Sequence, residues 1–248
     1  MRRFKLVYLL FAIVLCGALL PARADTALFT DSTFNLTNYT TSTNVSGGAS
    51  VTELAQCASC GNPGTALQIG MLFPGPVGTG STADAVLVNN TVSYDPETQG
   101  DISSVSASVD KNLTLTSSSG GGDTFHPVIE QDSIFYVASI VGTGLTGPGT
   151  TGYETLSDAD LAASDFVAYD FATNTYGTAN PNFDGDTMLF GLAQISSSDG
   201  PAILTADYDN LSIDLAPVAT PEPSSLLLLP IGLAGLIVGS RRRLAFNN

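Results

Sequence analysis

Short runs in which polar and apolar residues alternate recur along the middle of the chain. The clearest run covers residues 102–115, where Ser and Asp alternate with Val, Ala and Leu. Such alternation is typical of a β-strand that places one face on a hydrophobic core. Further runs rich in β-branched residues extend over 65–73, 85–94, 124–141, 165–171, 187–195 and 202–215. Because a helical period of 3.6 is almost absent from this region, we expect an all-β fold.

The segments between these runs carry residues that favour turns. Examples are Asn62-Pro63-Gly64 and the glycine-rich stretches 117–122 and 142–149. Regularly spaced strands and turns predict a single β-sandwich or jelly roll over residues 25–217. One segment departs from this pattern, because Ser157 precedes acidic residues and alanines up to Ala163. A short helix is predicted there.

A signal peptide is predicted at the amino terminus, over residues 1–24. Arg2, Arg3 and Lys5 precede an apolar run over 6–20 that is expected to be helical. Ala22 and Ala24 then supply the small residues that signal peptidase requires, so this protease is an expected partner. The mature chain would begin at Asp25, in a non-cytoplasmic compartment.

A second apolar segment, residues 224–240, lies close to the carboxyl terminus. Its length is near the lower limit for an α-helix that crosses a bilayer, and Arg241, Arg242 and Arg243 follow it directly. Basic residues on one flank place that end in the cytoplasm. Residues 218–248 are therefore expected to form a tail with a transmembrane helix that anchors a precursor in the membrane.

The start of this tail carries a short motif, Pro221-Glu222-Pro223. This motif, the apolar helix and the terminal arginines together resemble the PEP-CTERM sorting tail of exported proteins in Gram-negative bacteria. The resemblance implies that an exosortase recognises the tail of an inner-membrane precursor. It further implies release to the cell surface or the extracellular matrix, in association with exopolysaccharide or biofilm. It covers only the end of the chain and does not indicate what the exported part binds.

The charge of the exported part is strongly one-sided. Residues 25–220 hold 22 of the 23 acidic residues and one basic residue, Lys111, which gives a formal charge of −21. Such a surface cannot neutralise phosphates with lysine and arginine, which excludes nucleic acid and disfavours anionic lipid. Cations, basic surfaces and neutral glycans are the favoured partners. The simpler alternative is that the charge only keeps the protein soluble.

Several segments of the middle region also look like parts of jelly-roll domains related to concanavalin-A-like and carbohydrate-binding modules. They are Gly61-Asn62-Pro63-Gly64 before a strand, residues 102–110, residues 125–129, and the final run over 208–213. The resemblance implies a β-sandwich and adds glycan binding to the functions to be considered.

Cys57 and Cys60 are the only cysteines of the predicted mature chain. In an exported protein they are expected to form a small disulfide loop. A redox motif would need a helix that begins at the cysteines, whereas Gly61-Asn62-Pro63-Gly64 follows them. A zinc site would need two more ligands, and His126 alone cannot supply them. The disulfide is the preferred interpretation.

His126 is the only histidine, and no serine stands at a spacing that suggests a catalytic partner. A catalytic triad would depend on this single ring, which favours a packed or edge histidine. A glycosidase needs two carboxylates at a defined separation, which a sequence does not reveal. We therefore predict that the protein is not an enzyme.

A calcium ion is the candidate cofactor. Asn182-Phe183-Asp184-Gly185-Asp186 places oxygen donors at alternate positions around a glycine, an arrangement that suits a hard cation, so Asp184 and Asp186 are the candidate ligands. The alternative is an Asp-Gly turn between two strands. Asp207 and Asp209 form a weaker candidate pair, because alternate positions on a strand also describe its solvated face.

Two functions remain open from the sequence. The first is a non-enzymatic surface or matrix protein that is sorted through its PEP-CTERM tail. The second is a glycan-binding module, or a weak glycan-processing enzyme, on a calcium-assisted β-sandwich. A row of exposed tyrosines on one face, drawn from Tyr136, Tyr153, Tyr169 and Tyr176, would favour the second.

Overall fold

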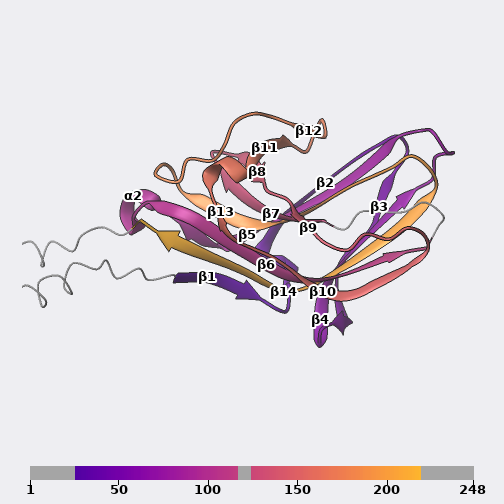
Figure 1. Cartoon of the computed structure of the whole chain (residues 1–248), viewed down its shortest axis with the longest axis horizontal. Helices are drawn as coiled ribbons and strands as arrows, with labels where there is room; N and C mark the ends of the chain where they lie inside the picture. The colour runs from indigo at the N-terminus through magenta and orange to yellow at the C-terminus, as the bar shows by residue number, and fades with distance from the viewer. Residues whose placement is uncertain (1–25, 117–123, 219–248) are drawn as a thin grey trace, which may run out of the picture. The chain divides into compact units, whose positions relative to one another are not determined.

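The computed structural model describes residues 26–116 and 124–218, and within these ranges the chain folds into two antiparallel β-sheets (Figure 1). The first sheet has the strand order β10-β6-β14-β4-β3, with β1 paired to β14. Its strands are β1 (Thr26–Asp31), β3 (Ser50–Gly61), β4 (Gly64–Phe73), β6 (Ile102–Leu115), β10 (Gly149–Leu161) and β14 (Ala202–Pro217).

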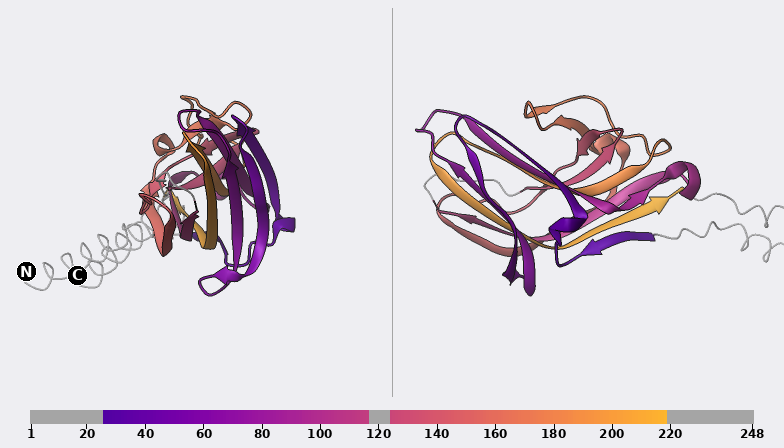
Figure 2. Two further views of the ribbon diagram at one scale, coloured as in Figure 1. Left: turned by 90° about the vertical axis from the view of Figure 1, so that its right-hand side faces the viewer. Right: turned by 180° about the vertical axis from the view of Figure 1, so that it is seen from behind.

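The second sheet has the order β12-β11-β8-β7-β13-β5-β2, with β9 paired to β7. Figure 2 shows its strands and those of the first sheet as two layers. Its strands are β2 (Tyr39–Ser46), β5 (Ser81–Tyr94), β7 (Thr124–Gln131), β8 (Ile134–Val137), β9 (Ile140–Val141), β11 (Val167–Asp170), β12 (Thr175–Tyr176) and β13 (Met188–Ser198). Short helical turns are η1 (Leu36–Asn38), α2 (Pro96–Gln99) and η2 (Ala163–Asp165).

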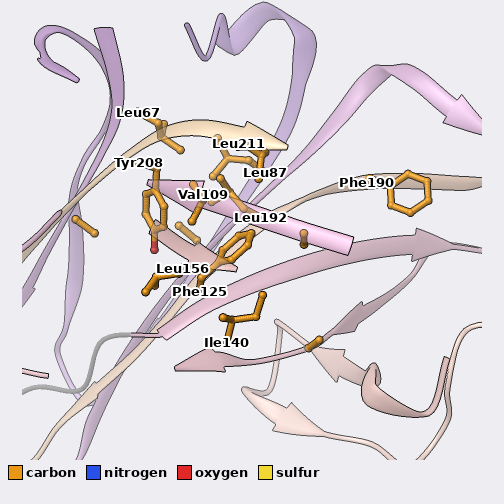
Figure 3. Close-up of a cluster of buried hydrophobic side chains, with 14 of the residues drawn as sticks. Leu67, Leu87, Val109, Phe125, Ile140, Leu156, Phe190, Leu192, Tyr208 and Leu211 are labelled. Carbon is orange, nitrogen blue, oxygen red and sulfur yellow. The ribbon is translucent and has the colours of Figure 1, made fainter. Parts of the chain in front are cut away.

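The hydrophobic core lies between the two sheets. Alternate residues of β6 and β14 turn inward, so that Val109 and Tyr208 meet Leu87 and Leu192 of the second sheet (Figure 3). Each of these side chains is fully buried. Because side chains alternate along a strand, the residues between them point to the outer face of the first sheet.

Lys111 is also directed into this core. Its ammonium group donates to the carbonyl oxygen of Thr124 at 2.7 Å and lies 5.1 Å from the ring centroid of Tyr208. A hydrogen bond and a cation–π contact compensate in part for the removal of the charge from water. The neighbouring residues Asp110 and Asn112 therefore lie on the opposite, outer face of β6.

The outer face of the second sheet carries a smaller apolar cluster. Tyr169 and Phe171, from β11 and the segment that follows it, cover Val86, Val88 and Val128. The hydroxyl of Tyr169 donates to the buried carboxylate of Asp84 at 2.8 Å. The outer face of the first sheet has no such apolar cluster among the described residues.

The predicted β-sandwich is confirmed, whereas several element predictions need correction. The short helix predicted around 157–163 is wrong, because these residues continue the edge strand β10, which pairs with β6, and a 3-10 turn follows only at Ala163. The predicted run over 124–141 consists of three strands, and β1, β2, β3, β10 and β12 were not predicted.

The two terminal helices were predicted from segments outside the described residues. Within 26–116 and 124–218, no helix is long and apolar enough to cross a membrane.

Candidate functional site

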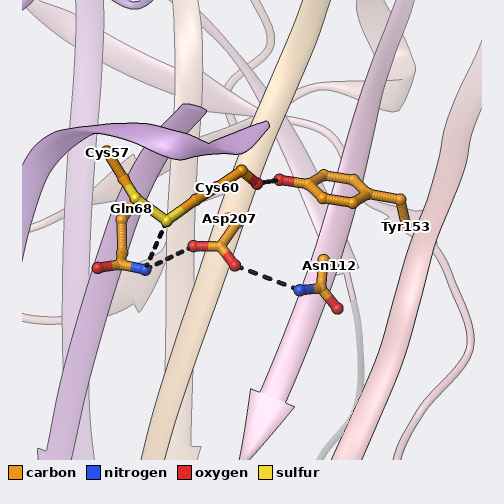
Figure 4. Close-up of a disulfide and its surroundings, with 6 residues drawn as sticks. All are labelled: Cys57, Cys60, Gln68, Asn112, Tyr153 and Asp207. Carbon is orange, nitrogen blue, oxygen red and sulfur yellow. Dashed lines mark hydrogen bonds between the residues drawn. A yellow bond between two sulfur atoms is a disulfide. The ribbon is translucent and has the colours of Figure 1, made fainter. Parts of the chain in front are cut away.

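A row of four polar side chains crosses the outer face of the first sheet (Figure 4). Gln68 on β4 is paired with Asp207 on β14, Asp207 with Asn112 on β6, and Asn112 with Tyr153 on β10. Asp207 accepts a hydrogen bond from Gln68 Nε2 at 2.8 Å and another from Asn112 Nδ2 at 3.2 Å. The row is therefore held by hydrogen bonds as well as by strand register.

Two further rows flank this central row. Thr205 and Thr114 pair on one side, and Asp209 and Asp110 pair on the other. We use the name polar platform for the outward side chains of these three rows, which are Gln68, Asp110, Asn112, Thr114, Tyr153, Thr155, Thr205, Asp207 and Asp209. Their position follows from the alternation of β6 and β14, whose intervening residues fill the core.

The tip of the β3–β4 hairpin, residues 57–63, folds over one part of the polar platform. A disulfide joins Cys57 and Cys60, whose Cα atoms are 5.5 Å apart. Gln68 Nε2 lies 3.7 Å from Cys60 Sγ, and the hydroxyl of Tyr153 donates to the carbonyl oxygen of Cys60. The hairpin tip thus contacts both ends of the central row.

Burial and the nearby negative charges keep the Tyr153 hydroxyl protonated. Burial raises the pKa of this phenol, and the negative charges of Asp207, Asp209 and Asp110 raise that pKa further. A protonated hydroxyl can donate to Cys60, which fixes the orientation of the tyrosine ring.

The carboxylates of Asp209 and Asp110 accept hydrogen bonds from neighbouring residues. Asp209 accepts from the backbone N–H groups of Asn62 and Asn210, at 2.6 and 2.7 Å. Asp110 accepts from Asn210 Nδ2 at 2.9 Å and from Thr155 Oγ1 at 2.5 Å. Within residues 26–116 and 124–218 the only lysine or arginine is Lys111, which lies on the other face of the sheet. The platform is therefore rich in acceptors and negatively charged.

His126 is buried in β7 next to a serine that the sequence did not indicate. Its Nδ1 lies 2.9 Å from the carbonyl oxygen of Ala138 and 3.1 Å from Ser139 Oγ. A carbonyl oxygen can only accept, so Nδ1 carries the proton and cannot take one from Ser139. Burial lowers the pKa of His126 to about 4. Ser139 therefore lies close to His126, but this contact is not a nucleophile–base pair.

A cavity of about 350 Å³ lies elsewhere, between β8, β10 and the turn before β11. It shares no residue with the polar platform. Its lining includes Ser139 and the exposed carboxylates of Asp158, Asp160 and Asp165. Asp160 accepts from Ser104 and Asp165 from the backbone of Ala162, so these carboxylates take part in local hydrogen bonds.

The candidate calcium ligands Asp184 and Asp186 are exposed in the turn that leads to β13. Gln131 holds this turn through Nε2, which donates to the carbonyl oxygens of Asn182 and Asp186 at 2.9 and 2.7 Å. In the part of the chain that the structure describes, no group of three or more His, Cys, Asp or Glu residues could hold a metal ion. Calcium binding here stays a prediction.

The tyrosines considered from the sequence do not form one row. Tyr136 is buried in the core, and Tyr169 and Tyr176 belong to the second sheet, where their ring centroids are 4.7 Å apart. Tyr153 alone lies on the polar platform. Outside the described residues lie the predicted signal peptidase site and sorting signal, which are Ala22, Ala24, Pro221, Glu222, Pro223, Arg241, Arg242 and Arg243.

Sequence reasoning missed Gln68 and Asn112 as site residues. For Asn112 the available signal was its outward position within the alternating run 102–115, but nothing in the local sequence distinguished either residue from other solvated residues. Asp207 was considered only as a weak cation ligand. Its two amide partners are 139 and 95 residues away along the chain, so only strand pairing brings the three together.

No family model matches the sequence, and no curated protein matches it. Among solved structures, the chain is similar to a carbohydrate-binding module of the β-sandwich superfamily, with 12% identity over 77% of this chain and 63% of that chain and a TM-score of 0.39. It is also similar to the C-terminal family 22 carbohydrate-binding module of Clostridium thermocellum Xyn10B, with 12% identity, coverage of 80% and 99%, and a TM-score of 0.36.

A third similar structure is the CBM22-1 xylan-binding domain of Paenibacillus barcinonensis Xyn10C, with 14% identity, coverage of 80% and 99%, and a TM-score of 0.36. At these identities and TM-scores the likenesses define neither a family nor a ligand for this chain. The functional argument therefore rests on the geometry of the polar platform.

Proposed function

We propose that the polar platform binds a neutral carbohydrate and that the protein is a non-catalytic glycan-binding module. The observation that carries this proposal is the hydrogen-bonded row of Gln68, Asp207, Asn112 and Tyr153 across four strands. A site built on paired strands is rigid before the ligand arrives. Less conformational entropy is then lost on binding.

The chemistry of the row suits a sugar. Sugar hydroxyl groups both donate and accept hydrogen bonds, and the platform offers carboxylate and amide oxygens together with amide N–H groups. The half-buried ring of Tyr153 supplies an apolar surface for the C–H face of a sugar ring. A few fixed polar groups beside an aromatic side chain are typical of small-molecule recognition.

Charge narrows the class of glycan. Three carboxylates, Asp110, Asp207 and Asp209, lie on the platform without a neighbouring lysine or arginine on the same face. An anionic sugar brought next to them would be repelled. Neutral polysaccharides are therefore favoured over uronate-containing ones.

The experiment is a binding measurement on a panel of polysaccharides, with and without calcium. Xylan, mannan, cellulose and agarose represent neutral chains, and alginate represents anionic ones. The wild-type chain should bind at least one neutral polymer and not alginate. Absence of binding to every polymer, with and without calcium, would contradict the proposal and favour a purely structural matrix role.

Variants of the central row locate the site. Asn112→Ala and Gln68→Ala each remove one amide, which should weaken binding about 3- to 10-fold at roughly 1 kcal/mol per hydrogen bond. Tyr153→Ala should weaken it more, because aromatic anchors contribute about 2 kcal/mol or more. Tyr176→Ala, on the second sheet, is the matched control and should bind like the wild type.

A non-catalytic role is supported by the state of the groups that could catalyse. Nδ1 of His126 donates its proton to the carbonyl oxygen of Ala138 in a hydrogen bond. The carboxylates of Asp110 and Asp209 accept hydrogen bonds from Asn62, Asn210 and Thr155. Neither arrangement leaves a free base beside a nucleophile. Release of reducing ends from the bound polymer during prolonged incubation would contradict this part of the proposal.

We further propose that this module is exported and sorted through its carboxyl terminus. The support comes from the sequence alone, from Pro221-Glu222-Pro223, the apolar segment 224–240 and the arginines 241–243. Replacing Glu222 by Ala in the full chain should leave the precursor in the inner membrane. Unchanged release of the exported part would count against processing by an exosortase.

A further inference from the structure

The hairpin tip covers one end of the polar platform and leaves the other end open. The exposed fraction of the outward side chains therefore increases along β14 from the covered end to the open end. Asp209 is 1% exposed, Asp207 is 8% exposed, Thr205 is half-buried and Ile203 is 45% exposed. These residues alternate along a single strand and face the same side of the sheet. The cover therefore ends near the central row.

The cause of this cover is an irregularity in β3. Its register with β4 shifts between the pair Cys57–Ala66 and the pair Gly61–Gly64, so that β3 contains two more residues than β4 over this interval. The extra residues arch over the outer face of the sheet (Figure 4). The disulfide closes the base of this arch, and the Tyr153 hydroxyl binds its far side at Cys60.

Further hydrogen bonds fix the hairpin tip at the closed end. The backbone N–H of Asn62 donates to Asp209 at 2.6 Å, and Asn210 Nδ2 donates to the carbonyl oxygen of Asn62 at 3.4 Å. The hydrogen bonds that residues 57–63 make with the platform involve the central row or the Asp209–Asp110 row. On the other side, Thr205 and Thr114 remain half-buried and Thr116 is exposed.

We infer, on the basis of the proposed function, that the platform recognises the terminal residue of a neutral glycan chain and not an internal segment. A chain that enters over the Thr205–Thr114 row and follows the strands meets the hairpin tip at the central row, where Cys60 contacts Gln68 and Tyr153. Two residues along a strand advance by only about 6.4–6.8 Å, so little platform remains past the central row. The chain must therefore end there.

The chemistry of the closed end agrees with a chain terminus. A terminal sugar retains a hydroxyl group that an internal sugar has used in its glycosidic bond. Asp207 lies at the corner where the platform meets the hairpin tip, and its carboxylate oxygens accept hydrogen bonds. This corner can accept from the additional hydroxyl, which the neighbouring internal sugars do not have.

The test measures whether binding follows the number of chain ends or the mass of polymer. Soluble xylan and soluble mannan are assayed before and after limited cleavage by an endo-acting hydrolase, which multiplies the chain ends at constant mass. The amount of wild-type protein bound per gram of polymer should rise in proportion to the ends created. Reduction of the reducing ends to alditols then assigns the recognised end, because it abolishes binding at one end only.

Two other outcomes overturn the inference in distinguishable ways. If the amount of protein bound per gram of polymer stays constant after cleavage, the protein binds internal segments. This result refutes end recognition but is compatible with glycan binding. No binding to intact or cleaved polymer refutes both. A Cys57→Ser/Cys60→Ser variant loosens the arch and should show increased binding to uncut polymer, whereas Tyr176→Ala should behave like the wild type.

Discussion

Protonation of His126 offers a quantitative test of how the core is built. The ring is buried in β7, and burial lowers its pKa from 6.5 to about 4, with the charge of Lys111 acting in the same direction. Between these two values the unfolded chain binds a proton that the folded chain does not bind. The free energy of unfolding must therefore fall as the pH drops below about 6.5.

The magnitude follows from the difference between the two pKa values. Each pKa unit corresponds to about 1.4 kcal/mol, so the loss should reach about 3 kcal/mol at pH 4 and about 2.5 kcal/mol at pH 4.5. Above pH 7 the ring is neutral in both states and contributes no pH dependence. Many carboxylates titrate in the same range, so the contribution of His126 has to be isolated by a variant.

Urea unfolding of the wild type and of His126→Gln at pH 7 and pH 4.5 provides this comparison. Glutamine keeps an amide donor for Ala138 but does not titrate. The difference in unfolding free energy between the two proteins should change by about 2.5 kcal/mol between the two pH values. Ser139→Ala, which keeps the histidine, should follow the wild-type profile. Parallel profiles for the wild type and His126→Gln would refute the reasoning and mean that the ring titrates normally in the folded protein.

Three further predictions address the platform and the second sheet. Gln68→Ala leaves one oxygen of the nearly buried Asp207 without its donor and should reduce the unfolding free energy by about 1.5–3 kcal/mol in urea titrations, whereas a change below 0.5 kcal/mol would show that this bond is unimportant. Cys57→Ser/Cys60→Ser opens a loop of a few residues and should reduce stability by about 2 kcal/mol from chain entropy; a larger loss would indicate that the arch also supports the sheet. Burial raises the pKa of Asp84, so Asp84→Asn should raise Tm at neutral pH and lose this advantage in acid, and an advantage independent of pH would contradict the assignment.

The strands that the sequence predicts best are those with one face in the core. In β6 and β14 most core-facing residues are apolar, with Lys111 as an exception, and most outward residues are polar, so the period of two is plain. Strand β10 is not predicted as a strand, and its last part is predicted as a helix, because it is an edge strand with few buried side chains. Its Ser157 and the acids after it resemble a helix cap locally, but pairing with β6 determines their conformation.

The candidate site was less predictable than the fold, for a physical reason. Gln68, Asn112 and Tyr153 lie on three different strands, and only the strand order β10-β6-β14-β4 brings them beside Asp207. Local periodicity reveals which face of a strand is outward, but it does not reveal the neighbours across the sheet. The disulfide was predictable because both cysteines lie close together in the sequence, whereas the arch over the platform depends on the register shift in β3.

The most direct test of glycan binding at the polar platform is a ¹⁵N NMR titration of residues 25–217 with neutral oligosaccharides. The side-chain amide groups of Gln68 and Asn112 report on the central row, and the backbone amides of residues 57–63 report on the hairpin tip. Binding should shift these signals with one dissociation constant and leave those of Tyr176 and its neighbours unchanged. Shifts confined to the second sheet, or no shifts with any neutral oligosaccharide that the protein retains, would contradict the account.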